Sequence, residues 1–396
     1  MKFGPVLLFP FAPLMYRTTK LVFLDFDDRK NHLLGAGQAK ATYEVGRRLA
    51  AKGYDITVVS SRFPGSYDRR EAGINYRHIG LGTRYIRLNN AAYILCVPFV
   101  ISRLRADLVI ECFTAPISTL FTPLWTGTPV VAVPSSFEAR RFSRLYHLPF
   151  FLIERLGMPL YRYFLPYTPY QDQKMRQVNP QVTSSIVGQG VNPGDFRVTS
   201  RTPRHLLFLG RLDLDQKGLD LLLTAFARVA SRLKLPLVIA GHGPDRDRVL
   251  ALIAKLRLEK SVRLTGPAYG LQKKRLLSRS LLAVIPSRHE GFCIFALEAL
   301  AAGVPVVGFD IPGLSWLSPE VSFKSPAYDV ELFADQLINA AKKAANPRLK
   351  TRCRKLARNF SWDEVANKYH SFFQTVLAPQ AVPSPIPGYL LHSAKK

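Results

Sequence analysis

Cysteine is scarce in this sequence. The four cysteines among 396 residues form no Cys-x-x-Cys pair and no cluster with metal-ligand spacing. This excludes a zinc module and gives no indication of a disulfide framework. We expect buried free thiols, as in a reducing cytoplasm. The four positions are Cys96, Cys112, Cys293 and Cys353.

Long apolar runs are also missing. No stretch reaches the roughly 20 apolar residues needed to span a bilayer. Residues 3–15 are apolar but contain three prolines and no clear small-residue cleavage site, so a secretory signal is not expected. Residues 1–19 are either a segment that contacts a membrane or a loosely packed extension.

Acidic residues are outnumbered by basic ones. There are 28 Asp and Glu against 55 Lys and Arg, a net charge of +27. The excess occurs in both halves, with 24 basic and 12 acidic residues in 1–192 and 31 and 16 in 193–396. Such charge implies an anionic partner: membrane, nucleic acid or substrate phosphates. No nucleic-acid module accompanies it, so nucleic acid is not expected.

The three-glycine dinucleotide fingerprint is absent. Lys20–Phe26 is typical of a buried strand, and Asp55–Val59 of the next one. Between them, Gly35 and Gly37 precede a helical pattern that ends near Lys52. Two glycines, without a fitting acid after the second strand, disfavour a nicotinamide dehydrogenase. The glycines either let the backbone approach a ligand or merely form a tight turn.

The most informative stretch is a strand–helix–strand unit. Leu281–Ile285 and Val304–Gly308 have the composition of buried parallel strands, with a predicted helix over 291–302 between them. Eight residues separate Glu290 from Glu298, so both can lie toward one side of the helix.

These carboxylates suit a sugar nucleotide. One can bind hexose hydroxyls and the other the ribose diol, while backbone N–H groups of Gly291, Phe292 and Cys293 can meet phosphate or sugar oxygens. The alternative is two solvated surface glutamates. Glu298 lies in an apolar run, where an unpaired carboxylate is costly, and this favours binding.

A cationic loop follows a second predicted strand, His205–Leu209. Arg211 and Lys217 lie in this loop, before a helical pattern over 219–233. Ligands of open α/β sheets bind at this edge, where Arg can hold a phosphate with two hydrogen bonds and Lys adds a mobile charge. A solvated charge pair is the alternative.

Together these motifs resemble the retaining glycosyltransferases of family 4, with their Glu-x7-Glu signature and Gly-Arg…Lys-Gly diphosphate clamp. The resemblance extends over Lys20–Leu377 and is specific over 205–310. It implies an α/β protein of the GT-B fold, two facing Rossmann-like domains with parallel sheets and a cleft between them. The implied parts are an extension 1–19, an acceptor domain 20–192, a linker 193–204, a nucleotide-sugar domain 205–360, a helix 361–377 that crosses back and a disordered tail 378–396.

The resemblance also implies roles for residues. Arg211, Lys217 and Glu290 would be catalytic. The donor would be held by these three with Gly35, Gly37, Gly291, Phe292, Cys293 and Glu298. A hexose would pass from a nucleoside diphosphate to a lipid-linked or glycan acceptor, as in cell-envelope polysaccharides, with retained configuration. The leaving phosphate would deprotonate the acceptor, and neither metal nor separate cofactor is expected.

Two departures from the family pattern stand out. Many members carry a His after the strand that corresponds to Pro129–Val133. Here the next residues are Pro134-Ser-Ser-Phe-Glu138, so Ser135, Ser136 or Glu138 would replace it. In loop 309–316, Ser315 or Trp316 stands near the family's Glu and would alter sugar contacts.

Two segments bear on membrane contact. Residues 91–101 carry no charge and predict a buried helix. Residues 140–165 interleave cations with apolar residues; we expect core from Phe150 onward and lipid or acceptor contact for Arg140–Arg144. The protein is therefore expected in the cytoplasm, in peripheral contact with the inner face of an anionic membrane. A catalytically silent GT-B partner at that surface is the alternative function.

Overall fold

A computed structural model describes residues 18–34, 37–113, 117, 119–135, 137, 139–198 and 201–378. Gly35, Ser136 and Glu138 lie outside the described residues, as do residues 1–17 of the predicted extension and 379–396 of the predicted tail. The chain divides into two compact units, Met1–Leu160 and Tyr161–Lys396, here the N-terminal and C-terminal units. The domain bounds given above stay a prediction.

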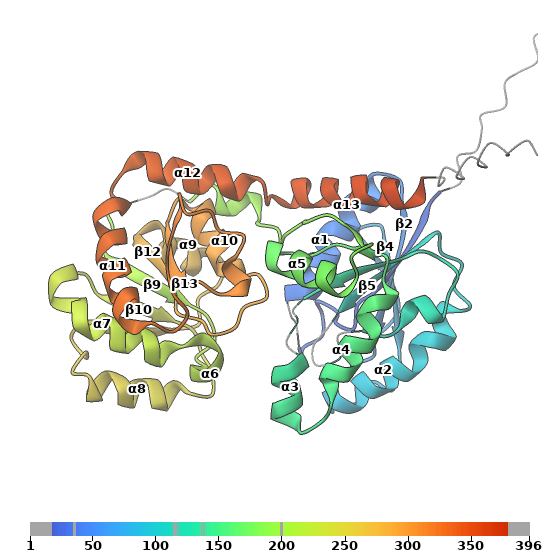
Figure 1. Ribbon diagram of the computed structural model, residues 1–396, viewed down its shortest axis with the longest axis horizontal. Coiled ribbons are helices and arrows are strands. Elements are labelled where there is room, and N and C mark those ends of the chain that lie inside the picture. Colours follow the sequence, from blue (N-terminus) through green and yellow to red (C-terminus); the bar gives the residue numbers. More distant parts are fainter. Residues whose placement is uncertain are drawn as a thin grey trace, which may run out of the picture. The chain divides into compact units, whose positions relative to one another are not determined.

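The first sheet has eight strands in the order β3-β4-β2-β1-β5-β6-β7-β8 (Figure 1). β1 pairs in parallel with β2 and β5, and the short β3 runs antiparallel to its partner β4. The strands are β1 Lys20–Leu24, β2 Asp55–Ser61, β3 Arg69–Glu71, β4 Ile74–Ile79, β5 Leu108–Phe113, β6 Val130–Pro134, β7 Tyr163–Phe164 and β8 Thr183–Ser184.

The helices that accompany this sheet follow from the sequence pattern, with two corrections given below. α5 has a capping box, in which Thr168 and Gln171 satisfy each other's backbone N–H groups. The helices are α1 Gly37–Ala51, α2 Ile86–Ile101, α3 Ala139–Tyr146, α4 Phe150–Gly157 and α5 Pro169–Val178.

The second sheet has six strands in the order β11-β10-β9-β12-β13-β14, and all its pairs are parallel. Its strands β9, β10, β12 and β13 are almost wholly buried, as their continuous apolar runs predicted, whereas the edge strands β11 and β14 are partly exposed. The strands are β9 His205–Leu209, β10 Leu237–Ala240, β11 Val262–Gly266, β12 Ser280–Ile285, β13 Val306–Phe309 and β14 Ser322–Ser325.

The helices in the second half of the chain differ in burial. Nearly all of α10 is buried. The long last helix, α13, is capped by Ser361, whose side-chain oxygen accepts a hydrogen bond from Glu364 N. The helices are α6 Leu214–Lys217, α7 Leu219–Leu233, α8 Arg246–Lys255, α9 Gly270–Ser278, α10 Ile294–Ala301, α11 Val330–Ala344, α12 Pro347–Arg358 and α13 Trp362–Leu377.

The prediction of two α/β domains with parallel sheets is confirmed. In each sheet the strand order reverses beside one central strand. β1 lies between β2 and β5, and β9 lies between β10 and β12. Such switch points are where ligands bind in open sheets. They direct attention to the loops after β1, β9 and β12.

Segment 191–361 begins and ends at one place. Val191 N donates to Phe360 O at 2.9 Å, and Val191 forms an isolated parallel bridge with Ser361. The chain thus enters and leaves the second sheet side by side.

Two helices differ from prediction. α2 is not a buried helix: it begins at Ile86 rather than 91 and leaves large apolar side chains exposed. Residues 140–165 form α3 and α4, and the prediction that the part from Phe150 onward belongs to the core is wrong for α4. Within α4 only Glu154 and Gly157 are buried, so its apolar side chains are at least partly exposed.

Candidate functional site

The loop after β9 places the predicted cations. Asp213 caps the short helix α6, its side chain accepting from Gln216 N at 2.8 Å. Gly218 ends α6 in the left-handed region, with φ 63°, which favours glycine. A Cβ there would overlap the carbonyl oxygen of Pro286. The loops that follow the neighbouring strands β9 and β12 are therefore packed tightly together.

Lys217 and Glu290 meet at this contact. Lys217 Nζ lies 2.7 Å from Glu290 Oε1, and Ser287 Oγ donates to the same oxygen at 2.6 Å. Behind Glu290 the backbone of Gly313 approaches so closely that a Cβ would overlap the glutamate. Glu290 is thus fixed by the loops after β9, β12 and β13, and its carboxylate faces a cation.

Electrostatics keep the lysine charged. Burial lowers the pKa of the Lys217 ammonium and Arg211 lowers it further, but the attraction of Glu290 outweighs both, so the pKa is raised. Burial, and then the charge of Glu290, raises the pKa of the Cys293 thiol well above its usual range. The site therefore offers an ammonium and a guanidinium beside a neutral thiol.

The second glutamate also has a cationic partner. Glu298 lies in α10, and Lys273 Nζ of α9 is 2.6 Å from its Oε1. Both side chains are mostly buried, with 10% of Glu298 and 17% of Lys273 exposed. The prediction from sequence missed Lys273. Its signal was a basic helix ahead of the Glu motif, but nothing in the spacing shows which of the basic residues faces Glu298.

α10 begins later than predicted. The helix starts at Ile294 rather than Gly291, because Cys293 adopts the left-handed conformation, with φ 58° and ψ 77°, and interrupts helical backbone upstream. Gly291, Phe292 and Cys293 therefore precede the helix instead of forming its first turn. The first N–H groups of α10 have no intrahelical partner, as at the start of any α-helix.

An arginine that the sequence did not single out braces these loops. Arg288 donates to both carboxylate oxygens of Asp220, at 2.9 and 2.7 Å, and to the carbonyl of Leu214 at 2.7 Å. Burial opposes ionisation of Asp220, but Arg288 lowers its pKa below the usual value. The two residues are 68 positions apart, so no local pattern could reveal the pair.

Ser315 and Trp316 of loop 309–316 contact neighbouring residues instead of projecting into solvent. The Trp316 ring stacks on Phe292 with 4.5 Å between centroids, and Trp316 Nε1 donates to Phe292 O at 2.7 Å. Trp316 is buried. Ser315 Oγ accepts from Tyr170 N at 3.4 Å. Trp316 therefore fixes the backbone of Phe292, and an effect of Ser315 or Trp316 on sugar contacts stays a prediction.

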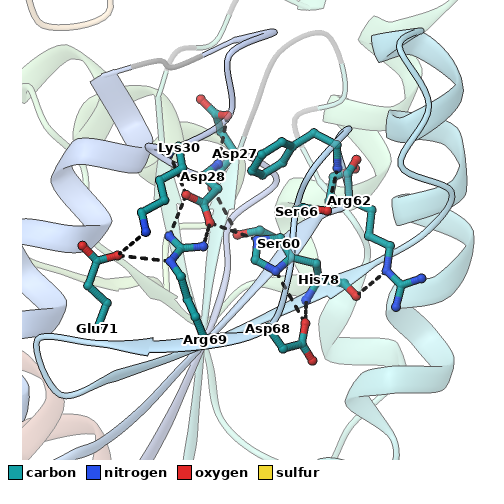
Figure 2. Close-up of polar contacts among 12 residues, drawn as sticks. Asp27, Asp28, Lys30, Ser60, Arg62, Ser66, Asp68, Arg69, Glu71 and His78 are labelled. Atoms are coloured by element: carbon teal, nitrogen blue, oxygen red, sulfur yellow. Dashed lines mark hydrogen bonds and ion pairs between the residues drawn. The ribbon is translucent and has the colours of Figure 1, made fainter.

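A buried charged network follows β1 in the N-terminal unit. Figure 2 shows Asp28 between Arg69 of β3 and His78 of β4. Arg69 donates to both carboxylate oxygens of Asp28, at 2.7 and 2.9 Å, and His78 Nε2 lies 3.0 Å from Oδ2. Burial raises the pKa of Asp28, but His78 and Arg69 outweigh it and hold the pKa well below its usual range. This network anchors the loop between β1 and α1.

A second carboxyl lies deeper, at the end of β1. Asp25 is fully buried, and Thr42 Oγ1 of α1 donates to it at 2.5 Å. Thr42 Oγ1 is also 3.8 Å from Cys112 Sγ of β5. Burial raises the pKa of Asp25 to about 7, against the hydrogen bond from Thr42, which lowers it. The carboxyl is therefore partly protonated near neutral pH.

The remaining predicted positions are placed as follows. Gly37 is the first residue of α1, whereas Gly35 lies outside the described residues. Ser135 Oγ donates to Phe113 O at 2.7 Å, which ties β6 to β5. Among the described helices none is long and apolar enough to span a bilayer. The described part of the chain contains no group of three His, Cys, Asp or Glu suited to a metal ion.

Two family models match consecutive parts of the chain. "Glycosyltransferase Family 4" matches residues 35–194, and "Glycosyl transferases group 1" matches residues 196–360. The chain is 29% identical over 220 residues to an uncharacterized glycosyltransferase of Methanocaldococcus jannaschii, a match that covers 48% of this chain and 53% of that protein. The chain thus spans about half the length of the curated relatives it matches.

Solved structures of the same fold cover nearly the whole chain. Sucrose-phosphate synthase from Thermosynechococcus elongatus superimposes with a TM-score of 0.74 at 17% identity, covering 91% of this chain and all but 1% of that one. HepE of Anabaena, solved with UDP and glucose, gives a TM-score of 0.63 at 14% identity, covering 90% of this chain and 100% of that one.

Proposed function

We propose that this chain is an enzyme that moves a hexose from a nucleoside diphosphate to an acceptor. The proposal is supported by the match of residues 35–194 to the glycosyltransferase family 4 model, the match of residues 196–360 to the group 1 model, and the GT-B fold. The transfer would retain the anomeric configuration. The observation that carries this proposal is the Lys217–Glu290 ion pair. It joins the diphosphate-type motif after β9 to the Glu-x7-Glu motif after β12, across 73 residues.

The cations would receive the donor diphosphate. Arg211 is exposed and electrostatically coupled to Lys217, which leaves it able to hold phosphate oxygens with two hydrogen bonds. Lys217 would release Glu290 in part and contact the phosphate bound to the sugar. Such preset charges stabilise the charge that develops on the leaving group and supply the largest share of catalysis in many enzymes.

The two glutamates would read the sugars. Glu290 would accept hydrogen bonds from hydroxyls of the transferred hexose, and Glu298 from the ribose. In each, Oε1 already accepts from a lysine in this structure. Each lysine would therefore orient its glutamate when the donor enters. HepE, a protein of the same fold, binds UDP and glucose, and we propose a donor of this class here.

The chemistry would need no carboxylate nucleophile. The leaving phosphate oxygen would take the proton of the acceptor hydroxyl on the same face of the sugar, as the carbon–oxygen bond to the acceptor forms and the bond to the phosphate breaks. Arg211 and Lys217 would supply the charge neutralisation that a divalent ion supplies in other phosphate chemistry, so transfer would be independent of metal. The acceptor would be a lipid-linked molecule or glycan.

A ligand screen followed by turnover tests this function. We expect a nucleoside diphosphate at 100 times its Kd to raise the free energy of unfolding by about 2.7 kcal/mol. The matching sugar nucleotide, with an acceptor, should release nucleoside diphosphate. Lys217→Ala and Glu290→Ala should each lower this release by about 10²- to 10³-fold.

The control is Lys255→Ala, an exposed lysine of α8, which should leave both binding and turnover unchanged. If no sugar nucleotide yields free nucleoside diphosphate, the chain is a silent member of the fold. If both site variants turn over as the parent does, the assignment of the site is wrong.

A further inference from the structure

Helix α2 carries apolar side chains on both its buried and its exposed side. Its buried stripe is Asn89, Tyr93, Val97 and Ile101, and Asn89 Oδ1 accepts from Thr83 N at 2.8 Å. Its outer stripe instead carries Leu95 and Phe99, which are 70% and 65% exposed. Large apolar side chains at four-residue spacing on the solvent side lie on one helix face.

A second apolar surface lies on α3 and α4. The two helices pack together, with Phe151 N donating to Ser143 Oγ at 3.0 Å. Leu148, between them, is 53% exposed, and Leu156 of α4 is 65% exposed. Exposed apolar groups in such number across neighbouring elements mark an interaction site rather than an ordinary protein surface.

The two surfaces meet in the N-terminal unit. The Arg87 guanidinium of α2 lies 5.2 Å from the centre of the Tyr146 ring of α3. Tyr146 in turn contacts Phe150 edge-on, with 6.2 Å between centroids. Figure 1 shows α2, α3 and α4 in the same part of that unit. We call the outward sides of these three helices the α2–α4 face.

The charges on this face have one sign. Residues 83–105 contain no acid, and residues 139–160 contain a single one, Glu154, which is buried. The exposed arginines of these two segments include Arg84, Arg87, Arg103, Arg140, Arg144 and Arg155.

We infer that the α2–α4 face docks on an anionic lipid membrane. Leucine and phenylalanine would enter the boundary between headgroups and acyl chains, while the arginines bind lipid phosphates. Pairing of two copies through this face would bring like charges together, which is destabilising, and binding of nucleic acid would not require exposed leucines. This inference deepens the proposed function, since it gives transfer to a lipid-linked acceptor a membrane surface on which to occur.

Sedimentation with vesicles tests the face directly. The full chain is mixed with vesicles of phosphatidylcholine, with or without phosphatidylglycerol, at low and high salt. We expect binding only to the anionic vesicles, and weaker binding at high salt. The double substitution Leu95→Ser with Phe99→Ser should weaken binding by about tenfold or more. Arg103→Gln and Arg140→Gln should each weaken it by about fivefold.

The matched controls lie in the C-terminal unit. Leu271→Ser removes an equally exposed leucine, and Arg232→Gln an exposed arginine; both should bind as the parent does. Thermal unfolding confirms that each variant is folded. The readout requires no turnover, and Lys217→Ala should bind vesicles normally, so a failed transferase assignment and a failed docking surface give different results.

Three outcomes would overturn the inference. Equal binding to neutral vesicles would remove the role of charge. Equal losses for the control and the face variants would mean general attraction of a basic protein. A concentration-dependent dimer in light scattering that Leu95→Ser with Phe99→Ser abolishes would assign the face to a second copy of the chain.

Discussion

The two charged networks of this protein differ in how far they are removed from water. In the N-terminal unit, Arg69 and Asp28 have 7% and 0% of their side-chain surface exposed. In the C-terminal unit, Lys217 and Glu290 retain 17% and 10%. A fully buried pair whose groups all have partners belongs to the fold, whereas a pair that still reaches solvent can exchange its partner for a ligand. Burial thus distinguishes a pair that serves stability from the pair that we propose binds the donor.

The largest expected effect breaks the buried network. Asp28→Ala would leave the Arg69 guanidinium buried without its double hydrogen bond and remove the partner of His78. Removal of one member of a buried pair costs about 3–5 kcal/mol of unfolding free energy. Urea denaturation measures it. Glu331→Ala, which removes an exposed partner of Arg228, is the control and should cost under about 1 kcal/mol.

A pH-dependent effect of similar origin is expected at Asp25. Its pKa is about 7 in the folded protein and 3.8 ordinarily, so the folded state holds the proton more tightly. The stability this gives is complete below pH 3.8 and is lost as pH rises through 7. Asp25→Asn should abolish the loss, which by pH 8 amounts to at most about 4 kcal/mol.

Urea denaturation of both proteins from pH 5 to 8 measures this difference. The unfolding free energy of Asp25→Asn, relative to that of the parent, should increase steadily as pH rises. A difference that stays constant across the range would show that the carboxyl does not titrate there.

A smaller effect is expected on binding in the C-terminal unit. Lys273→Met would leave Glu298 without the cation that orients it. We expect about tenfold weaker binding of the nucleoside diphosphate, together with a loss of about 1–3 kcal/mol of unfolding free energy because the mostly buried Glu298 loses its partner. Titration calorimetry gives the affinity. Lys274→Met, on the same helix, is the control, and equal affinity losses in both would contradict a specific role of Lys273.

The smallest effect concerns packing beneath the site. Trp316→Phe keeps an aromatic ring against Phe292 but removes the hydrogen bond from Nε1 to the Phe292 carbonyl. The loss should be about 1 kcal/mol of unfolding free energy, with nucleotide affinity nearly unchanged. A strong loss of sugar-nucleotide turnover at full stability would instead place Trp316 in contact with the donor.

Local patterns predicted the fold and part of the site. An apolar run gave His205–Leu209 with its observed bounds, and short spacings brought out Arg211, Lys217 and the two glutamates. What they missed joins distant segments. Asp28 and His78 are 50 positions apart, and no periodicity encodes their contact. The start of α10 was also predicted wrongly. Cys293 is left-handed and delays the helix, and a composition favourable to helix does not reveal such a residue.

The sequence did not predict the exposed apolar sides of α2 and α4, for a related reason. An apolar run such as residues 91–101 shows that side chains avoid water, but not whether protein or lipid replaces it. Exposure of Leu95 and Phe99 is visible only once the neighbours of α2 are in place.

The bridge between Val191 and Ser361 has a consequence for protein engineering. A segment whose first and last residues are hydrogen-bonded neighbours can be cut out or have its ends rejoined without stretching the backbone. Residues 191–361 could therefore be transferred into a related scaffold or circularly permuted.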